Sequence, residues 1–234
     1  MVELVEETAR TTSLLLKPAD WVGHQAGQHV DVRLTAEDGY QAQRSYSIAS
    51  GPEDEHLVLT VERLDDGEVS PYLVGELRAG DELELRGPIG GYFVWTQALG
   101  GPLLLVAGGS GIVPFRSVLR HRAAVGSDVP TRLLYSARSL DDVIYRDELT
   151  RLDAAADGLE TRYALTREWP ADWDGHRGRI DRELLDEVAW PAQQTGLTYI
   201  CGPSGFVEAA AATLVDAGHD PGRIRTERFG PTGQ

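Results

Sequence analysis

The sequence has very little of several residue types from which binding sites are often built. Its one cysteine, Cys201, excludes a disulfide within the chain and any metal cluster held by several cysteines. Lys17 is its one lysine, and 37 acidic residues against 22 basic ones give a net charge of -15. Such an acidic chain argues against a nucleic-acid or anionic-membrane partner. The six histidines show no spacing typical of a metal site, so we predict no metal.

Long apolar runs are missing as well. No segment approaches the ~18 consecutive apolar residues that a membrane-spanning helix needs. The first residues are acidic where a secretory signal peptide is basic. We therefore expect a cytoplasmic protein without a membrane partner.

The length of 234 residues allows two domains, with a boundary near residues 98–101. Before this boundary, short segments of alternating polarity are separated by turn residues, which is typical of an antiparallel barrel or sandwich. We expect one or two strands in residues 3–16, further strands at 28–34, 44–50, 56–63 and 82–86, and a short helix at 69–77. The prediction is an N-terminal antiparallel β-barrel over residues 1–99.

After the boundary, strands alternate with helices, which predicts a parallel sheet. The expected strands are residues 102–107, 132–136, 159–166, 197–201 and 224–229, and the expected helices are 112–125, 141–155, 181–189 and 204–217. We therefore predict a Rossmann-like α/β domain with five parallel strands over residues 100–234. Ligands of such sheets bind beyond the carboxyl ends of the strands.

The glycine-rich segment 108–114 joins the first of these strands to a helix. Glycine lets the backbone bend tightly there and lets a phosphate approach the free N–H groups at the start of the helix. The segment is not a Gly-x-Gly-x-x-Gly fingerprint, because Pro114 takes the place of the last glycine, and it lacks the Lys-Ser/Thr of a Walker A loop. Taken alone, it is also compatible with a simple tight connection.

Four motifs follow one another in a recognisable order. They are Arg44-Ser-Tyr-Ser47, Gly87-Pro-Ile-Gly-Gly-Tyr-Phe93, Gly108-Gly-Ser-Gly-Ile-Val-Pro114 and Cys201-Gly-Pro-Ser-Gly-Phe206, with Glu227-Arg-Phe229 after them. In this order, the chain from about Thr11 to Phe229 resembles the ferredoxin–NADP reductase family of flavoproteins. The form it resembles carries one flavin and no iron–sulfur domain.

The resemblance implies that the first domain binds FAD, with FMN the weaker alternative. Arg44 would pair with the flavin pyrophosphate, the ring of Tyr46 would stack on the flavin, and the hydroxyl of Ser47 would reach the region of flavin N5. A surface strand with a solvated arginine would show the same residues, and Ser70 could equally be a helix cap. Further flavin contacts are expected from Ile48, Val61, Arg63, Gly67, Val69, Ser70 and Phe229, the last standing where the family often has a tyrosine.

The resemblance also implies a nicotinamide nucleotide in the second domain. Ser136 and Arg138 follow a strand where the adenosine ribose lies in such folds, and an arginine there can accept a 2′-phosphate, which favours NADPH over NADH. The same arginine would also suit a plain exposed sheet edge. The expected nucleotide contacts are Gly109, Ser110, Gly111, Pro114, Ser136, Arg138, Thr166, Arg167, Cys201, Gly202 and Pro203.

The implied activity is hydride transfer from NAD(P)H to flavin N5 at the cleft between the domains, lined by Ser47, Cys201 and Glu227. Glu227 could also be a plain solvent-facing strand residue. Electrons would pass to a separate acceptor, first of all a ferredoxin or an oxygenase component. Two alternatives stay open: a reductase of small acceptors such as a quinone, free flavin or oxygen, and a flavin-holding relay or sensor that does not itself oxidise NAD(P)H.

Overall fold

The computed structural model describes residues 1–155, 157–194 and 196–230. The chain packs as two compact units, which are described separately. Unit 1 comprises Met1–Thr96 and Val113–Val125, and unit 2 comprises Gln97–Ile112 and Gly126–Gln234. The helix after the glycine-rich segment therefore packs in unit 1, although the chain on either side of it belongs to unit 2. The domain ranges 1–99 and 100–234 stay a prediction.

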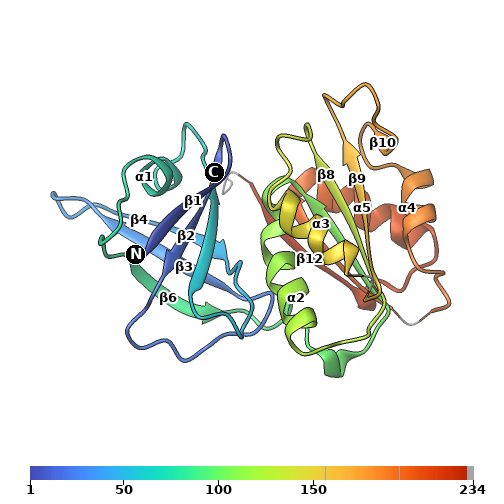
Figure 1. Ribbon diagram of the computed structural model, residues 1–234, viewed down its shortest axis with the longest axis horizontal. Coiled ribbons are helices and arrows are strands. Elements are labelled where there is room, and N and C mark those ends of the chain that lie inside the picture. Colours follow the sequence, from blue (N-terminus) through green and yellow to red (C-terminus); the bar gives the residue numbers. More distant parts are fainter. Residues whose placement is uncertain (156, 195, 231–234) are drawn as a thin grey trace. The chain divides into compact units, whose positions relative to one another are not determined.

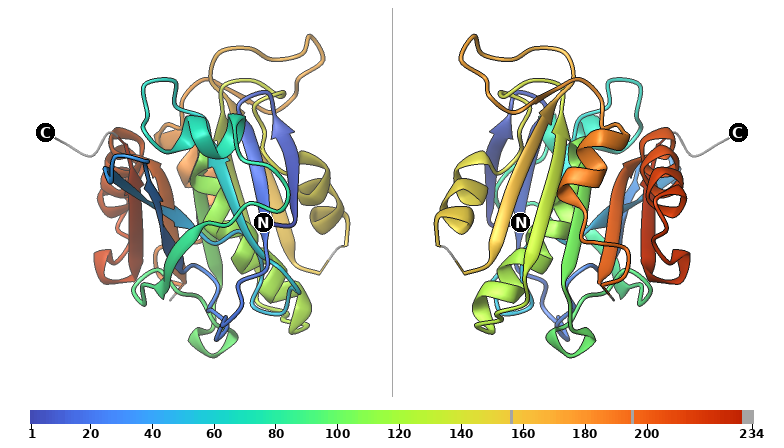
Figure 2. Two further views of the ribbon diagram at one scale, coloured as in Figure 1. Left: turned by 90° about the vertical axis from the view of Figure 1, so that its left-hand side faces the viewer. Right: turned by 90° about the vertical axis from the view of Figure 1, so that its right-hand side faces the viewer.

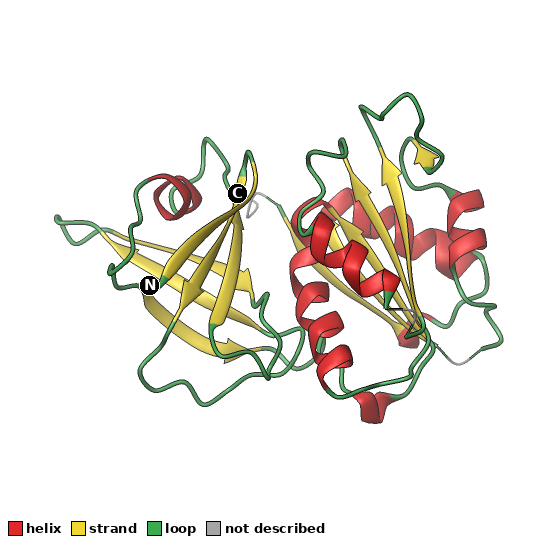
Figure 3. Cartoon of the chain, in the orientation of Figure 1, coloured by secondary structure: helices red, strands yellow, loops and turns green. Residues whose placement is uncertain are grey.

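Unit 1 contains two three-stranded antiparallel sheets (Figure 3). One has the order β1 (Glu3–Thr8), β2 (Thr11–Leu16) and β5 (Leu57–Glu62), and the other has the order β4 (Gln41–Ser47), β3 (His29–Thr35) and β6 (Glu84–Ile89). An isolated bridge between Ile48 and Leu59 joins the end of β4 to β5. The antiparallel architecture expected from the alternating polarity is confirmed.

The core of unit 1 follows the alternation along β3. Val30 and Val32 are fully buried, and the residues between them face outward. The short helix α1 (Ser70–Gly75) adds the fully buried Leu73 to the same cluster. The last strand, β6, runs three residues further than expected. It passes through Pro88, which the ladder tolerates because the pairing with β3 shifts register between His29 and Asp31.

Unit 2 is built on one parallel sheet with the order β10-β9-β8-β7-β11-β12. The strands are β7 (Leu103–Gly108), β8 (Thr131–Ala137), β9 (Leu159–Leu165), β10 (His176–Arg177), β11 (Leu197–Pro203) and β12 (Ile224–Phe229). The parallel sheet is confirmed, but the described residues form six strands instead of five. The two-residue β10 pairs with the end of β9 and is too short to leave a period in the sequence.

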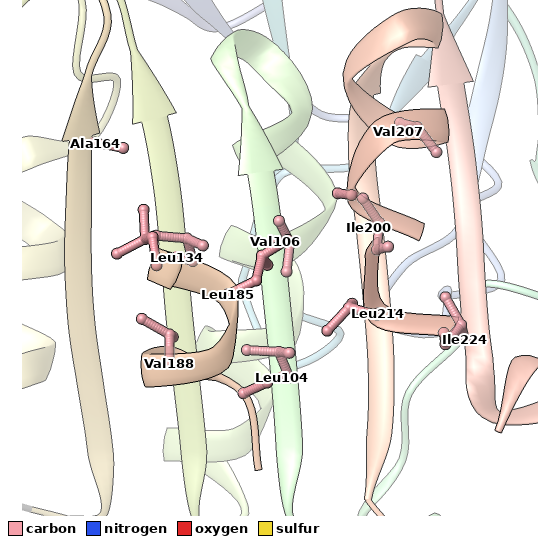
Figure 4. Close-up of a cluster of buried hydrophobic side chains, with 13 residues drawn as sticks. Leu104, Val106, Leu134, Ala164, Leu185, Val188, Ile200, Val207, Leu214 and Ile224 are labelled. Carbon is pink, nitrogen blue, oxygen red and sulfur yellow. The ribbon is translucent and has the colours of Figure 1, made fainter. Parts of the chain in front are cut away.

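Helices cover the faces of this sheet. Side chains of α4 (Arg182–Val188) and α5 (Ser204–Asp216) pack on one face, where Leu185 and Leu214 meet Val106 and Ile200 (Figure 4). The helix α3 (Arg146–Ala154) lies on the face opposite α4 (Figures 1 and 2). Single 3-10 turns are formed by η1 (Gln97–Leu99), η2 (Gly109–Ile112) and η3 (Pro221–Arg223).

One helix begins later than the sequence suggested. The expected helix 141–155 starts at Arg146, because Tyr145 before it has a left-handed backbone with φ of 62°. A turn precedes it, in which the Ser139 hydroxyl donates to the Asp142 carboxylate at 2.6 Å. The N–H of Asp142 also donates to the Ser139 carbonyl at 3.3 Å, so these residues form a turn before the helix.

The helix α2 (Val113–Ala124) is tied to unit 1 by polar contacts with the loop after Ile48. The buried hydroxyl of Ser117 donates to the Ser50 carbonyl at 2.6 Å. Arg120 pairs with Asp54 at 2.8 Å, and His121 contacts Glu53 at 2.7 Å. No helix among the described residues is long and apolar enough to cross a membrane.

Candidate cofactor-binding sites

The glycine-rich turn of unit 2 is held by close backbone packing. A Cβ on Gly111 would lie 2.1 Å from the carbonyl oxygen of Cys201, so a side chain cannot fit without displacing backbone. Gly109 has a left-handed φ of +55° and open space around it. Its backbone conformation, and not a lack of space for a side chain, therefore favours glycine at this position. Gly108 and Gly202 both lie against the ring of Phe206. The turn between β7 and α2 is therefore pressed onto the end of β11.

Cys201 and Glu227 lie next to each other at this sheet edge. They are paired residues on the adjacent parallel strands β11 and β12. Cys201 is only 3% exposed, and burial, with the charge of Glu227 second, raises the pKa of its thiol well above the usual value. Burial also raises the pKa of Glu227 to about 7. The thiol is therefore un-ionised, and the carboxyl group can hold or release a proton near neutral pH.

The predicted adenosine site follows the ends of β8 and β9. Ser136 is nearly buried, and the side chains of Arg138 and Arg167 are exposed. The backbone links the two strand ends, because the N–H of Thr166 donates to the Ala137 carbonyl and that of Arg167 to the Arg138 carbonyl, both at 2.9 Å. Two arginines are thus presented at the carboxyl edge of the sheet, where an anionic group of a nucleotide would be bound.

The predicted flavin strand is β4. Arg44 pairs in register with Val32, and Tyr46 with Val30, so both side chains lie on the face that carries the core. Burial raises the pKa of Tyr46 to about 12, which keeps its phenol neutral. The guanidinium of Arg44 makes an ion pair with Glu68, from Nη2 to Oε2 at 2.6 Å. A half-buried, neutral aromatic ring on the same strand face as an arginine is compatible with a stacked, phosphate-bearing ligand.

Ser47 is the last residue of β4 and pairs with His29, one position beyond Tyr46. Strand alternation therefore directs its side chain away from the face of Arg44 and Tyr46. Ile48, Val61 and Val69 are at most 1% exposed, because their side chains belong to the core of unit 1. These three positions can offer a ligand only their backbone.

The turn after β5 supplies the remaining predicted flavin residues of unit 1. Arg63 is exposed and pairs with Asp65 at 3.3 Å. The buried Ser70 accepts a hydrogen bond from the Leu64 N–H at 3.0 Å, so its hydroxyl closes the turn. The N–H of Gly67 donates to the Leu64 carbonyl at 2.9 Å. The structure thus gives Ser70 a turn-closing role, which neither of its two sequence interpretations described.

The last predicted residues stand on either side of the β11 end. Phe229 ends β12, pairs with Pro203 and is 37% exposed, and Gly202 is buried. Ser110 lies in η2, and Pro114 is a buried residue in the first turn of α2. In unit 2 the predicted nucleotide residues therefore gather at one edge of the sheet.

The sequence analysis missed Glu68 and Tyr40. The Tyr40 hydroxyl donates to Glu68 Oε1 at 2.7 Å, while Glu68 Oε2 accepts from Arg44. The three residues come from the β3–β4 turn, from β4 and from the turn after β5. Because Glu68 follows β5, which belongs to a different sheet from β3 and β4, no spacing along the sequence indicates the contact.

Both units contain features that fit the predicted cofactors. In unit 2, the left-handed Gly109 and the closely packed Gly111 form a tight backbone turn directly after β7, where a phosphate is predicted. In unit 1, an arginine and a half-buried tyrosine share one strand face. These residues have the donors and the ring that a nucleotide phosphate and a flavin require.

Two family models match the chain. Residues 2–94 match the model described as an oxidoreductase FAD-binding domain, and residues 105–212 match the model described as an oxidoreductase NAD-binding domain. The predicted cofactors, FAD and a nicotinamide nucleotide, are confirmed by these two matches.

Named relatives cover most of the chain. It is 30% identical over 235 residues to the glycine betaine monooxygenase reductase subunit of Pseudomonas aeruginosa, a match that covers 99% of this chain and 63% of the relative. It is 31% identical over 218 residues to NADH-cytochrome b5 reductase 1 of Aspergillus terreus, with 89% and 72% covered. The chain thus spans less than two thirds of the length of the first of these relatives.

A solved structure is similar over nearly its whole length. The flavohem-like FAD/NAD-binding domain of nitric oxide dioxygenase from Vibrio cholerae superimposes with a TM-score of 0.87 at 29% sequence identity. The match covers 98% of this chain and 96% of the other. The order of strands and helices described above is therefore shared with a protein whose name includes both cofactors.

Proposed function

This chain belongs to the ferredoxin–NADP reductase-like family of flavoproteins, and from that premise we propose that it is an NAD(P)H-dependent flavoprotein reductase. It takes a hydride from the reduced nicotinamide and passes electrons to a separate acceptor. FAD supplies the redox chemistry, because its ring accepts the hydride at N5 and can release electrons singly or in pairs.

The observation that carries this proposal is the packing of the glycine turn on Cys201, with Glu227 beside it. Gly111 touches the carbonyl of Cys201, and Glu227 pairs with Cys201 across the strands. A nucleotide phosphate at the turn would extend its nicotinamide along the same sheet edge toward these two residues. The contact of Gly111 with Cys201 supports placing the pyrophosphate and nicotinamide contacts of unit 2 side by side.

Residues of this chain would bind the two cofactors, orient their rings and hold a proton. Arg44 and the turn around Gly67 hold the flavin phosphates, and Tyr46 fixes the ring plane. Strand alternation directs the Ser47 side chain away from the face of Tyr46, so Ser47 would donate its hydroxyl toward N5 only if the chain bends where β4 ends. Cys201 packs against the nicotinamide as an un-ionised thiol and takes no covalent part, because burial keeps its pKa high. Glu227, with a pKa of about 7, holds a proton at its carboxyl group near the reacting atoms.

Arg138 and Arg167 support a preference for NADPH over NADH. Both guanidinium-bearing side chains are exposed at the ends of adjacent strands, and a 2′-phosphate is bound well by such a pair. A carboxylate that could accept the ribose hydroxyls of NADH does not directly follow the end of β8. Asp142 lies further along the chain, where it accepts a hydrogen bond from Ser139.

For the acceptor we propose an oxygenase component or a ferredoxin. A relative is the reductase subunit of a monooxygenase, which supports a protein acceptor. The single cysteine of this sequence cannot ligate a plant-type iron–sulfur cluster, so the cysteine ligands of such a cluster would have to lie outside this sequence. The net charge of -15 favours an acceptor whose docking surface is less acidic than that of a typical ferredoxin.

The test is the visible spectrum of the purified protein without oxygen, before and after addition of NADPH and, separately, NADH. We expect flavin bands that bleach within the mixing time, faster with NADPH. Ser47→Ala should slow the bleaching but keep FAD bound, whereas Ser45→Ala, which changes an exposed serine two residues earlier on the same strand, should keep FAD bound and bleach at the wild-type rate. A yellow protein that neither nucleotide bleaches would point to a relay or sensor.

A further inference from the structure

The guanidinium of Arg44 already has an anionic partner within the chain. Its Nη2 donates to Glu68 Oε2 at 2.6 Å, and its Nη1 donates to the Gln43 carbonyl at 2.7 Å. The side chains of Arg44 and Glu68 are 40% and 49% exposed. The pair is therefore accessible to a ligand from solvent.

Further hydrogen bonds within unit 1 keep the Glu68 carboxylate in contact with Arg44. Its second oxygen, Oε1, accepts the Tyr40 hydroxyl at 2.7 Å, so both carboxylate oxygens are hydrogen bonded. The backbone before it is fixed by the Gly67 N–H on Leu64 and by the Leu64 N–H on Ser70. The hydrogen bond from Tyr40, and then the one from Arg44, lower the pKa of Glu68, so this group is an anion at neutral pH.

A flavin phosphate and the Glu68 carboxylate need the same donor. If a phosphate takes the Nη2 group of Arg44, Glu68 must either leave it or stay beside a second anion. Both alternatives cost free energy, the first by breaking a charge-assisted hydrogen bond and the second by repulsion of like charges. Because the pair is exposed, the cost is small.

We propose that Glu68 is an intrachain counterion of Arg44 that competes with the flavin phosphates and lowers the affinity of this chain for FAD. The proposal rests on the proposed function, since it takes Arg44 as a phosphate-binding residue. Tyr40 is the positioning residue of this device, because its hydroxyl orients the carboxylate of Glu68 without touching Arg44.

The test is a titration of the full-length apoprotein with FAD, FMN and riboflavin, read by flavin fluorescence. We expect Glu68→Gln to tighten FAD and FMN binding roughly 3–10-fold at ~20 mM salt, and less at ~0.5 M salt, where exposed charges are screened. Riboflavin has no phosphate, so its binding should not change. Tyr40→Phe should give a smaller gain, because it leaves the charge of Glu68 in place.

Glu84→Gln is the matched control. Glu84 pairs with Arg33 in an equally exposed contact of the same unit, on the opposite face of the sheet from Arg44. This control should leave all three flavin affinities unchanged. In the Arg44→Ala background, Glu68→Gln should lose its effect, since the competition needs the arginine.

The outcomes separate this inference from the proposed function. If wild-type protein binds FAD and Glu68→Gln binds it equally or more weakly, Glu68 is not a competitor and the inference is wrong. A gain for riboflavin equal to that for FAD would also overturn it, because the effect would not involve the phosphates. If the wild-type chain binds none of the three flavins, the proposed function fails, and this inference fails with it.

Discussion

The predicted binding region of unit 2 is shaped by backbone, whereas that of unit 1 is shaped by side chains. In unit 2 the turn at Gly109–Ile112 is shaped by backbone, and Gly111 presses directly on the Cys201 carbonyl. In unit 1 the flavin strand presents side chains, and Arg44 is held in place by the Glu68 carboxylate and by the backbone carbonyl of Gln43. We therefore expect substitutions in the glycine turn of unit 2 to change both packing and nucleotide binding. Substitutions of the flavin-strand side chains in unit 1 should change flavin binding alone.

The largest effect should come from Gly111→Ala. Its new Cβ would overlap the Cys201 carbonyl oxygen, and strand β11 must move to make room. Overpacking of this kind costs ~1–3 kcal/mol or more, which corresponds to a fall in Tm of roughly 2–4 °C for each kcal/mol in a chain of this size. We expect calorimetry to show that fall and nucleotide titration to show loss of NAD(P)H binding.

Gly205→Ala is the control for that variant. Gly205 lies in α5 close in sequence to Cys201, and a Cβ on it would meet nothing within 4 Å. It should keep the wild-type Tm or raise it slightly, because alanine favours a helix. If Gly111→Ala were equally harmless, the backbone of unit 2 would be less constrained than its packing indicates.

The next largest effect should come from Arg44→Ala in unit 1. Loss of a charge-assisted hydrogen bond to phosphate costs about 1.5–3 kcal/mol, which is a fall in FAD affinity of roughly 10–150-fold. The Tm of the apoprotein should change little, because exposed ion pairs contribute at most ~1 kcal/mol. Arg33→Ala removes the other exposed arginine–glutamate pair of these sheets and should leave FAD affinity unchanged. A large loss of Tm with Arg44→Ala would contradict the contrast between the units.

The sequence predicted the elements of both units better than their sites. The run of apolar residues before Gly108 and the alternation around Val30 are strong local signals, and both became the strands expected. The missed β10 is two residues long, and the late start of α3 depends on the backbone of Tyr145. Short pairings and single left-handed residues leave no period in a sequence.

The two sites also differ in how far the sequence could predict them. Glycines at a strand–helix turn are visible in the sequence, so the crowding at Gly111 could be anticipated from its type. The partner of Arg44 could not be anticipated, because Glu68 lies 24 residues later in the turn after β5, a strand of the other sheet. Side-chain sites depend on such long-range neighbours, and their roles need a structure.

A smaller effect is expected from Arg138→Ala at the carboxyl edge of unit 2. If Arg138 binds a 2′-phosphate, its removal should raise the KM for NADPH about 10-fold, the equivalent of ~1.4 kcal/mol, and leave the KM for NADH nearly unchanged. Steady-state kinetics with both nucleotides measures this ratio. Arg151→Ala, on the exposed side of α3, is the control that should alter neither value. Equal changes for both nucleotides would remove the basis for an NADPH preference.

The smallest effect concerns the buried carboxyl of Glu227. Because burial raises its pKa from 4.5 to about 7, the folded chain keeps this proton between these pH values while the unfolded chain releases it. The stability from this proton is therefore present at low pH and is lost as the pH rises toward 7. Glu227→Gln cannot ionise, so it should gain on wild type at pH 8 relative to pH 5, by about 2–4 °C in Tm if screening leaves ~1 kcal/mol.

Thermal unfolding at pH 5 and pH 8 measures this difference, with Glu208→Gln on the exposed side of α5 as the control. The control should show no such dependence on pH, because the Glu208 side chain is exposed in the folded chain as it is in the unfolded one. Equal behaviour of the two variants would mean that Glu227 is as well solvated as Glu208. In that case Glu227 would be an ordinary solvated carboxylate at neutral pH and could not hold the proton that the proposed function assigns to it.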